Sequence, residues 1–549
     1  MLPELAFILA AVAVISLVEV LAEKSRLPAA ALLTIAGLCY ALLPGPNLAL
    51  NPEFILTFIL PPLLYSAALN SSLLAIRRNL RPVISLSVVL VLVTALVVGV
   101  GTDLLIPGVT LAAGTALGAA VAPPDPVAAL AIGRRAGLPP RLITLIEGEG
   151  LLNDATALTL FTVAAVAATS GNFSPGGAVA RFVLAAAGGI AVGAVTAGAV
   201  RLLRRFVHGP IVLNSLSLAT PFAAYLLGQE AHVSGVLAVV VTGLIVGHDT
   251  PRRSSGASRL QTAAVWRLAD FLLEGFVFLL IGQQLPAVIR GLRDYPTTTI
   301  LAAGCLTVGI VLVLRPAWLI GTQALPRRLR LRLGARDRDD QRRLSAPEIT
   351  VLSWAGTRGV ISLAAIFSLP LATEAGRPFP DRDLLIFCTY LVVLVTLLGQ
   401  GLTFAVLARA LGLRADFADQ ARTRNEARTA AVTAALRRLG ELAGGDDEDS
   451  DTRDVSPEVI AELRAGLERR ATRYRQRLDQ LDQAEDEDGD VALPPGYLAA
   501  IEARRAVIEA QREELLRWRD AGRLPDASLR VLQHELDLEE NSLRRPEAR

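Results

Sequence analysis

Long apolar stretches alternate with short polar loops along the first three quarters of the chain. A helix needs about 20 mostly apolar residues to cross the hydrocarbon core of a bilayer. Stretches of this kind lie near 3–22, 27–45, 52–70, 82–104, 108–132, 142–170, 177–203, 211–229, 233–248, 264–287, 298–325, 347–370 and 383–410. The pattern predicts an all-α polytopic membrane protein with about 13 transmembrane helices.

The sequence changes character after the last of these stretches. Residues 1–410 form the predicted membrane domain, and residues 411–549 form a small helical cytosolic domain that we expect to be regulatory. Its first amphipathic helix is followed by an acidic run, GGDDEDSDTRD. Ser456 and Pro457 then have the residue types preferred at a helix N-cap and first position. Further helices are expected near 497–520 and 526–544.

Composition supports a membrane protein. Of the 549 residues, 52% are hydrophobic, and the mean hydropathy is +0.47, which a soluble chain of this length rarely reaches. The three cysteines stand singly in apolar stretches, so neither a disulfide framework nor a zinc site is indicated. The N-terminal segment lacks a basic region and a cleavage site, and we expect it to be a retained span.

Basic residues gather in every second loop. They are Lys24, Arg26, Arg77, Arg78, Arg81, Arg134, Arg135, Arg141, Arg201, Arg204, Arg205, Arg252, Arg253 and Arg259, followed in the same phase by the long basic loop at 326–343. The intervening loops have few or no basic residues, with Arg293 and Arg377 as mild exceptions. Basic loops stay on the cytoplasmic side. The sequence therefore predicts a multi-pass protein of the plasma or inner membrane, with the N-terminus outside and the C-terminal domain in the cytoplasm.

The fifth span contains an acidic residue among prolines, in AVAPPDPVAAL. Asp125 lies between Pro124 and Pro126, and prolines remove backbone donors and break helices. Broken backbone at membrane depth is tolerated where it lines a cavity or is buried in protein. A kinked structural helix, with Asp125 capping its second half, is the plainer alternative to an ion site, and the two are compatible.

The sixth span contains three polar residues, in GEGLLNDATAL. At 100° of rotation per residue, Glu149 and Asn153 share a helix face, whereas Glu149 and Asp154 are about 140° apart. The two carboxylates therefore have different expected partners. We expect Asp154 to face the break at Asp125, where their oxygens, with carbonyl oxygens near Pro124, would suit a monovalent metal cation such as Na⁺ or K⁺. We expect the carboxamide of Asn153 to hold the break through a hydrogen bond.

Two arginines lie in later spans. Arg315 is near the middle of VLVLRPAWLI, and pairing it with Glu149 would relieve the cost of burying both charges. Arg358 lies between Gly356 and Gly359 in SWAGTRGVISL. A Gly-rich interruption here and a Pro-rich one in the fifth span occupy comparable places in two halves, which is typical of inverted-repeat transporters.

Two other polar residues give weaker signals. Glu274, in FLLEGFVFLLIG, is as consistent with an interhelical hydrogen bond as with transport. His232 lies near the outer end of a span, where a boundary anchor and a functional group are equally consistent with its position.

Six motifs occur in a characteristic order over residues 1–410: APPDPVA, GEGLLNDATAL, AHVSGVLAVVVTGL, LIGQQL, SWAGTRGVISLA and TLLGQGLT. In this order they resemble the monovalent cation:proton antiporter-1 family, which contains bacterial sodium/proton antiporters and the animal sodium/proton exchangers. The resemblance implies thirteen spans, a homodimer, and a mobile six-helix core in which broken spans five and twelve cross. An Asn-Asp pair in the sixth span also implies electroneutral exchange.

The resemblance assigns roles to individual residues. Asp154 resembles the essential carboxylate that binds either cation or proton, supported by Asp125 and Asn153. Glu149 and Arg315 would form a structural ion pair, and Arg358 would lie near the crossing of the broken helices. Two positions depart from the family. Pro124 offers only a carbonyl where many members have threonine, and Ser66 replaces an acidic residue near the cytoplasmic entrance.

These observations predict a secondary active antiporter that exchanges a monovalent cation for H⁺ by alternating access. Na⁺ is the first candidate, and Li⁺ and K⁺ stay open. We expect the bilayer and the transported ions as partners, and neither a cofactor, nor enzymatic activity, nor nucleic-acid binding. A cation channel is one alternative, although no repeated pore loop or acidic ring is visible. An intramembrane aspartyl protease is another, but its GxGD motif places aspartate directly after the second glycine, whereas GEGLLND displaces it by three residues.

Overall fold

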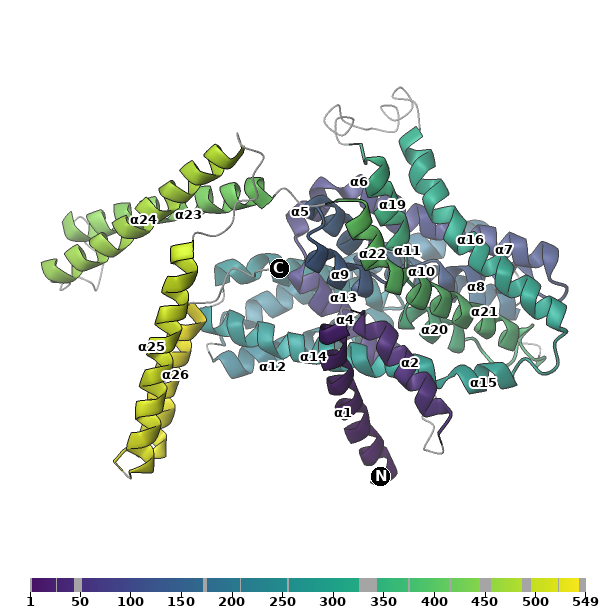
Figure 1. Ribbon diagram of the computed structural model, residues 1–549. Coiled ribbons are helices and arrows are strands. Elements are labelled where there is room, and N and C mark those ends of the chain that lie inside the picture. The colour runs from purple at the N-terminus through teal and green to yellow at the C-terminus, as the bar shows by residue number, and fades with distance from the viewer. Residues whose placement is uncertain are drawn as a thin grey trace. The chain divides into compact units, whose positions relative to one another are not determined.

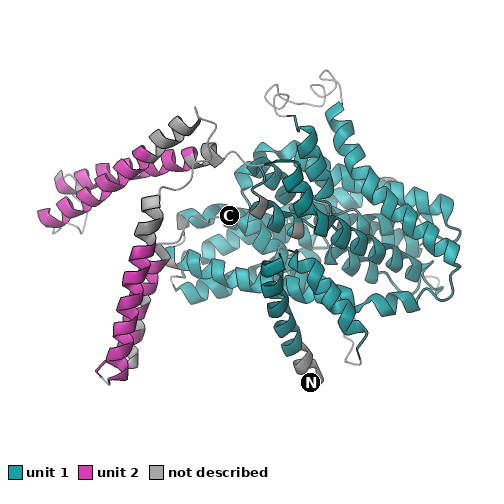
Figure 2. Ribbon diagram, viewed as in Figure 1, with its two compact units in different colours: residues 1–415 teal, residues 416–549 magenta. Residues whose placement is uncertain are grey.

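The computed structural model describes residues 2–25, 27–43, 52–170, 175–207, 209–253, 256–324, 343–373, 376–413, 417–444, 456–485, 495–521 and 523–542. The chain divides into two compact units, residues 1–415 and 416–549 (Figure 2). Both units are helical (Figure 1), which confirms the predicted all-α class. Most of the basic loop at 326–343 and of the acidic run at 444–454 lies outside the described residues.

The first unit is a bundle of helices. Its first half contains α1 (Leu2–Ser25), α2 (Ala29–Ala41), α3 (Pro52–Phe54), η1 (Ile55–Ile59), α4 (Leu60–Asn70), α5 (Leu73–Arg78), α6 (Leu80–Ile84), η2 (Ser85–Val89), α7 (Leu90–Leu105), α8 (Leu111–Val121), α9 (Val127–Ala136) and α10 (Pro140–Ser170). Its second half contains α11 (Pro175–Leu203), α12 (Pro210–Glu230), α13 (Gly235–Arg253), α14 (Gly256–Gln283), α15 (Leu285–Arg290), α16 (Thr297–Ala324), α19 (Ala346–Trp354), α20 (Val360–Phe367), α21 (Arg382–Leu394), η3 (Val395–Gln400) and α22 (Gly401–Ala410).

Seven helical segments among the described residues are long and apolar enough to cross a membrane. Each of them coincides closely with one of the apolar stretches predicted from the sequence. Three shorter apolar helices accompany them, at Ala29–Ala41, Leu111–Val121 and Gly235–Pro251. Each apolar stretch named from the sequence contains at least one helix. The chain is therefore an all-helical, multi-span membrane protein.

Small residues let some helices approach closely. At the crossing of α2 and α14, a Cβ atom on Gly37 would overlap the carbonyl group of Leu279, and one on Gly282 would overlap the carbonyl oxygen of Thr34. Lipid is as apolar as a leucine side chain, so close van der Waals packing of this kind holds helices together within a bilayer.

Two helical stretches are interrupted. α8 ends at Val121 and α9 begins only at Val127, because the prolines between them cannot continue the hydrogen-bond ladder. α19 ends at Trp354 and α20 begins at Val360, after the glycine-containing segment AGTRG. At each interruption, backbone N–H and C=O groups have no partner within their own helix. The candidate site lies around these groups.

The second unit contains four helices: α23 (Phe417–Gly444), α24 (Pro457–Glu485), α25 (Pro495–Asp520) and α26 (Asp526–Ser542). α23 packs against α24 and α25 against α26. Arg512 of α25 lies 2.6 Å from a carboxylate oxygen of Glu540 and 2.5 Å from one of Asp537, both on α26. Hydrogen bonds to these two carboxylates raise the pKa of Arg512. The pair of helices is thus joined by a charged cluster on an exposed face.

Candidate functional site

The two interruptions meet and satisfy each other's backbone. The backbone N–H of Asp125 donates to the carbonyl oxygen of Thr357 over 2.6 Å. In return, the Thr357 hydroxyl donates to the carbonyl oxygen of Asp125 over 2.8 Å. At Gly359 a Cβ atom would overlap the Asp125 carboxylate, so only glycine fits there. Residues separated by 232 positions in sequence therefore form one continuous feature.

α10 presents its polar residues to this crossing. The Asn153 amide donates to the carbonyl oxygen of Pro124 over 2.7 Å, while its buried Oδ1 atom has no hydrogen-bond partner among the described residues. Asp125 accepts from the N–H of Val127, the first residue of α9, over 3.0 Å and so satisfies one of the unpaired donors at the start of that helix. Asp154, which is 5% exposed, has no hydrogen-bond partner in the described part of the chain. The crossing thus combines one unpartnered carboxamide oxygen with a buried carboxylate that has no hydrogen-bond partner among the described residues.

Glu149 faces a different neighbour. Both of its carboxylate oxygens accept hydrogen bonds from the guanidinium group of Arg315, Oε2 over 2.8 Å. The Arg315 Nε–H donates to the carbonyl oxygen of Leu352 over 3.0 Å. The two side chains are only 4% and 2% exposed. A bidentate pair of this geometry satisfies both buried charges.

Arg358 is bonded to carbonyl groups. Its Nε–H donates to the oxygen of Val121 over 3.0 Å, and Nη2–H donates to that of Ala122 over 3.3 Å. Its Nη1–H donates to Gly356. Because Val121 is the last residue of α8, the guanidinium group lies at the negative end of that helix dipole. Arg358 therefore neutralises carbonyl groups that the broken helix leaves unpaired.

Two residues at the crossing were missed by the sequence reasoning. Thr357 bonds Asp125, as described above, and Thr396 accepts from the backbone N–H of Arg358 over 3.0 Å. Thr357 lies in the motif SWAGTRG. A hydroxyl group next to Arg358 in this glycine-containing interruption could have marked it as a candidate site residue. Thr396 lies in the widened helical turn η3, which no sequence pattern marks. His232 lies exposed in the turn after α12, with its backbone N–H bonded to Gln229.

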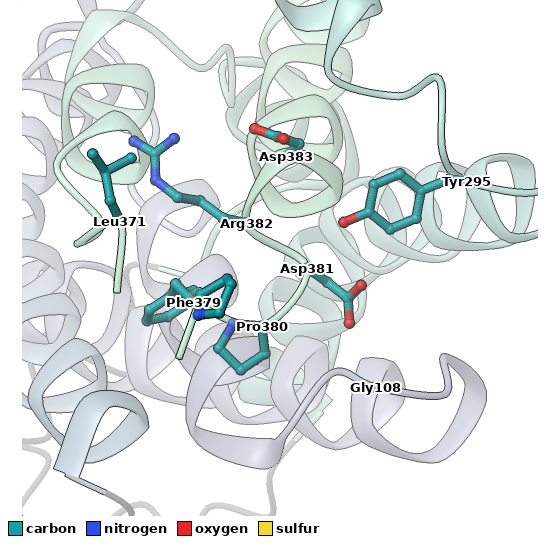
Figure 3. A pocket seen from close by; sticks show the side chains of 9 residues that line it. Gly108, Tyr295, Leu371, Phe379, Pro380, Asp381, Arg382 and Asp383 are labelled. Carbon is teal, nitrogen blue, oxygen red and sulfur yellow. The ribbon is translucent and has the colours of Figure 1, made fainter. Parts of the chain in front are cut away.

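A cavity of about 520 Å³ lies elsewhere, among loops before α8, before α16 and before α21 (Figure 3). Tyr295 and Asp381 point toward one another across it. Burial and the neighbouring Asp381 carboxylate raise the pKa of Tyr295 to about 12. Its lining residue Gly108 precedes α8, whereas Asp125 follows that helix, so some 11 residues of helix, about 16 Å, separate the two places. None of the predicted site residues lines this cavity.

Residues 8–410 match the sequence model of a protein family described as sodium/hydrogen exchanger, transmembrane. The chain belongs to the sodium/hydrogen exchanger family. This confirms the family expected from the six motifs, and makes the protein a multi-pass membrane transporter with Na⁺/H⁺ antiport activity rather than an enzyme. It also removes the protease alternative.

Individual exchangers match over much of their length. An uncharacterized Na⁺/H⁺ exchanger of Mycobacterium tuberculosis is 35% identical over 548 residues, which cover 99% of this chain and 96% of that protein. The Na⁺/H⁺ antiporter ApNhaP of Aphanothece halophytica is 33% identical over 419 residues, 75% of each chain. The solved structure of the sodium proton antiporter MjNhaP1 from Methanocaldococcus jannaschii at pH 8 matches this exchanger with a TM-score of 0.59 at 20% identity, over 74% of this chain and 98% of that one. The last comparison shows a shared fold.

Proposed function

We propose that this exchanger carries a monovalent cation against a proton by alternating access, and that the two ions compete for Asp154. The supporting observation is that Asp154 is buried and has no partner among the described residues, unlike Glu149. A buried carboxylate without a positive partner is costly. Binding a cation on one side of the membrane, and a proton on the other, relieves this cost in both states.

The proposed cation site consists of oxygen ligands around the crossing. They are the carboxylates of Asp154 and Asp125, the unpartnered Oδ1 atom of Asn153 and the carbonyl group of Pro124. Carboxylate, carboxamide and carbonyl oxygens suit hard monovalent cations. Na⁺ is the first candidate, with Li⁺ and K⁺ as the others. Because one bound cation or one proton leaves the same net charge, the exchange is electroneutral in this mechanism.

The proposed architecture has thirteen spans. The shorter segments α5 and α15 are not counted as spans, and the interrupted stretches α8–α9 and α19–α20 count as one span each. The matched interruptions support an inverted repeat, since both are bonded to each other at one crossing. The charge alternation of the loops supports an N-terminus outside and residues 411–549 in the cytoplasm as a regulatory domain. A homodimer follows from the family resemblance.

Cation-dependent proton movement in proteoliposomes tests this function. A pH gradient is imposed, Na⁺, Li⁺ or K⁺ is added in turn, and Asp154→Asn is compared with Glu230→Gln, which changes an exposed carboxylate at the end of α12. We expect the Asp154 variant to lose exchange while the Glu230 variant retains it. Full exchange by Asp154→Asn would overturn the mechanism. Ohmic cation currents without proton counterflow would instead support a channel.

A further inference from the structure

α14 carries two carboxylates that the proposed mechanism does not use. Asp270 and Glu274 are one helical turn apart and therefore share a face. Asp270 accepts a hydrogen bond from the hydroxyl of Ser66 on α4, over 2.6 Å. The Asp270 carboxylate thus lies where α14 meets α4.

Only half of the Asp270 carboxylate is satisfied. Ser66 donates to Oδ2, whereas the buried Oδ1 atom has no hydrogen-bond partner among the described residues. No described lysine or arginine forms an ion pair with Asp270. Leaving a buried carboxylate oxygen unpaired is costly. If the only role of Asp270 were to accept an interhelical hydrogen bond from Ser66, a neutral acceptor such as asparagine could fill that role without burying a charge.

The Ser66 hydrogen bond fixes the depth of Asp270. Ser66 lies four residues before the end of α4 at Asn70, about 6 Å along the helix, and the basic residues Arg77 and Arg78 follow in α5. Asp270 is therefore about one turn from the basic end of the bundle. Asp154 lies deeper, because it is about 21 Å along α10 from Pro140 at the same basic side.

Packing joins Asp270 to the helix that carries Asp154. One turn before Asp270, Trp266 packs against Tyr65 of α4, with ring centroids 5.4 Å apart. The same buried cluster includes Leu151 and Ala155 of α10, on either side of Asp154. α4, α10 and α14 therefore meet between the basic end of the bundle and the crossing.

We propose that Asp270 is the carboxylate that receives the cation on the basic-loop side, the cytoplasmic side in the proposed orientation, and passes it toward Asp154. Ser66 holds one carboxylate oxygen in place, and the other is available to the cation. The inference rests on the proposed function.

Asp270→Asn is the sharpest variant because asparagine keeps an oxygen that can accept from Ser66 and loses only the charge. Cation KM is measured in everted vesicles, where the cytoplasmic face is outside, and in right-side-out vesicles. We expect the variant to raise the cytoplasmic KM for the favoured cation about tenfold, the loss of one charge-assisted contact, with kcat within about twofold. The external KM and the KM values of Asp270→Glu stay close to wild type.

The control variants separate this role from a structural one. Ser66→Ala removes the hydrogen bond and keeps the carboxylate, so its cytoplasmic KM rises less than that of Asp270→Asn; the opposite order overturns the proposal. An unchanged cytoplasmic KM in a monodisperse Asp270→Asn protein, or an equal rise at both faces, also overturns it. Absence of cation/proton exchange by the wild type is a different result, and counts against the proposed function itself.

Discussion

Replacing Glu149 or Arg315 alone leaves a full charge buried without its partner. The side chains are 2% and 4% exposed, so water does not replace the lost contact. Removing one member of such a pair costs about 3–5 kcal/mol. We therefore expect Glu149→Leu and Arg315→Met each to lower the free energy of unfolding by that amount, which is two to four decades in the folding equilibrium at about 1.4 kcal/mol per decade.

The double variant distinguishes pairing from packing. With both charges removed, no charge is left buried without a partner. Apolar replacements of a buried ion pair are often neutral or stabilise the fold by about 1–4 kcal/mol. Arg315→Met also removes the hydrogen bond to the Leu352 carbonyl group, which costs about 1–3 kcal/mol. We expect the double variant to cost at least about 3 kcal/mol less than the sum of the single variants.

The assay is reversible unfolding of the purified exchanger in mixed micelles of increasing denaturing detergent, followed by far-ultraviolet circular dichroism. Glu147→Gln is a matched control on the same helix, because Glu147 pairs with an Arg134 side chain that is 60% exposed, and such pairs contribute about 1 kcal/mol or less. If Glu149→Leu cost no more than Glu147→Gln, or if the single costs simply added, the buried pair would not stabilise the fold as argued.

Three further variants test other features. Gly359→Ala would place a methyl group on the Asp125 carboxylate, so we expect transport to fall at least tenfold in proteoliposomes while the protein stays folded; wild-type transport would contradict the close approach. Gly282→Ala would press against the backbone of α2, and should lower the unfolding free energy by about 1–3 kcal/mol; an unchanged detergent midpoint would contradict this. The pKa of Tyr295 is raised to about 12 from an ordinary value of 10, so the folded state holds its proton more tightly and stability is lost as pH rises from 10 toward 12; Tyr295→Phe should lose less stability over this interval, and equal losses would refute the assignment.

Helical rotation accounts for much of what the sequence predicted at the site. About 140° separates Glu149 from Asp154, and in the structure Glu149 contacts Arg315 while Asn153 contacts the α8–α9 interruption. The prolines around Asp125 likewise predict a break, because proline cannot donate to the ladder. These inferences need only one helix at a time. The fold class followed in the same way from the lengths of apolar stretches.

Contacts between distant helices could not be predicted in this way. The bonds of Thr357 to Asp125 and of Ser66 to Asp270 join residues 232 and 204 positions apart. Each depends on the relative height and rotation of two helices, and a shift of one residue rotates a side chain by 100°. For Arg358 a carboxylate partner is the usual expectation at a buried site, but the structure gives it the carbonyl groups at the end of α8. A broken helix creates acceptors that a residue pattern does not display.

The distribution of these partners bears on how a charged site can move within a membrane. Glu149 and Arg315 are paired, and Arg358 is held by carbonyl groups. Asp125 has a backbone partner in Val127, which leaves Asp154 as the carboxylate at the crossing without a partner among the described residues. If every one of these groups is ionised, three carboxylates face two guanidinium groups and one negative charge is left over. In the proposed mechanism a single cation or a single proton cancels it, so both translocating states are neutral inside. Moving an uncancelled charge through hydrocarbon would add a large barrier, and the empty, charged carrier is therefore the state that cannot cross, which couples the two ions.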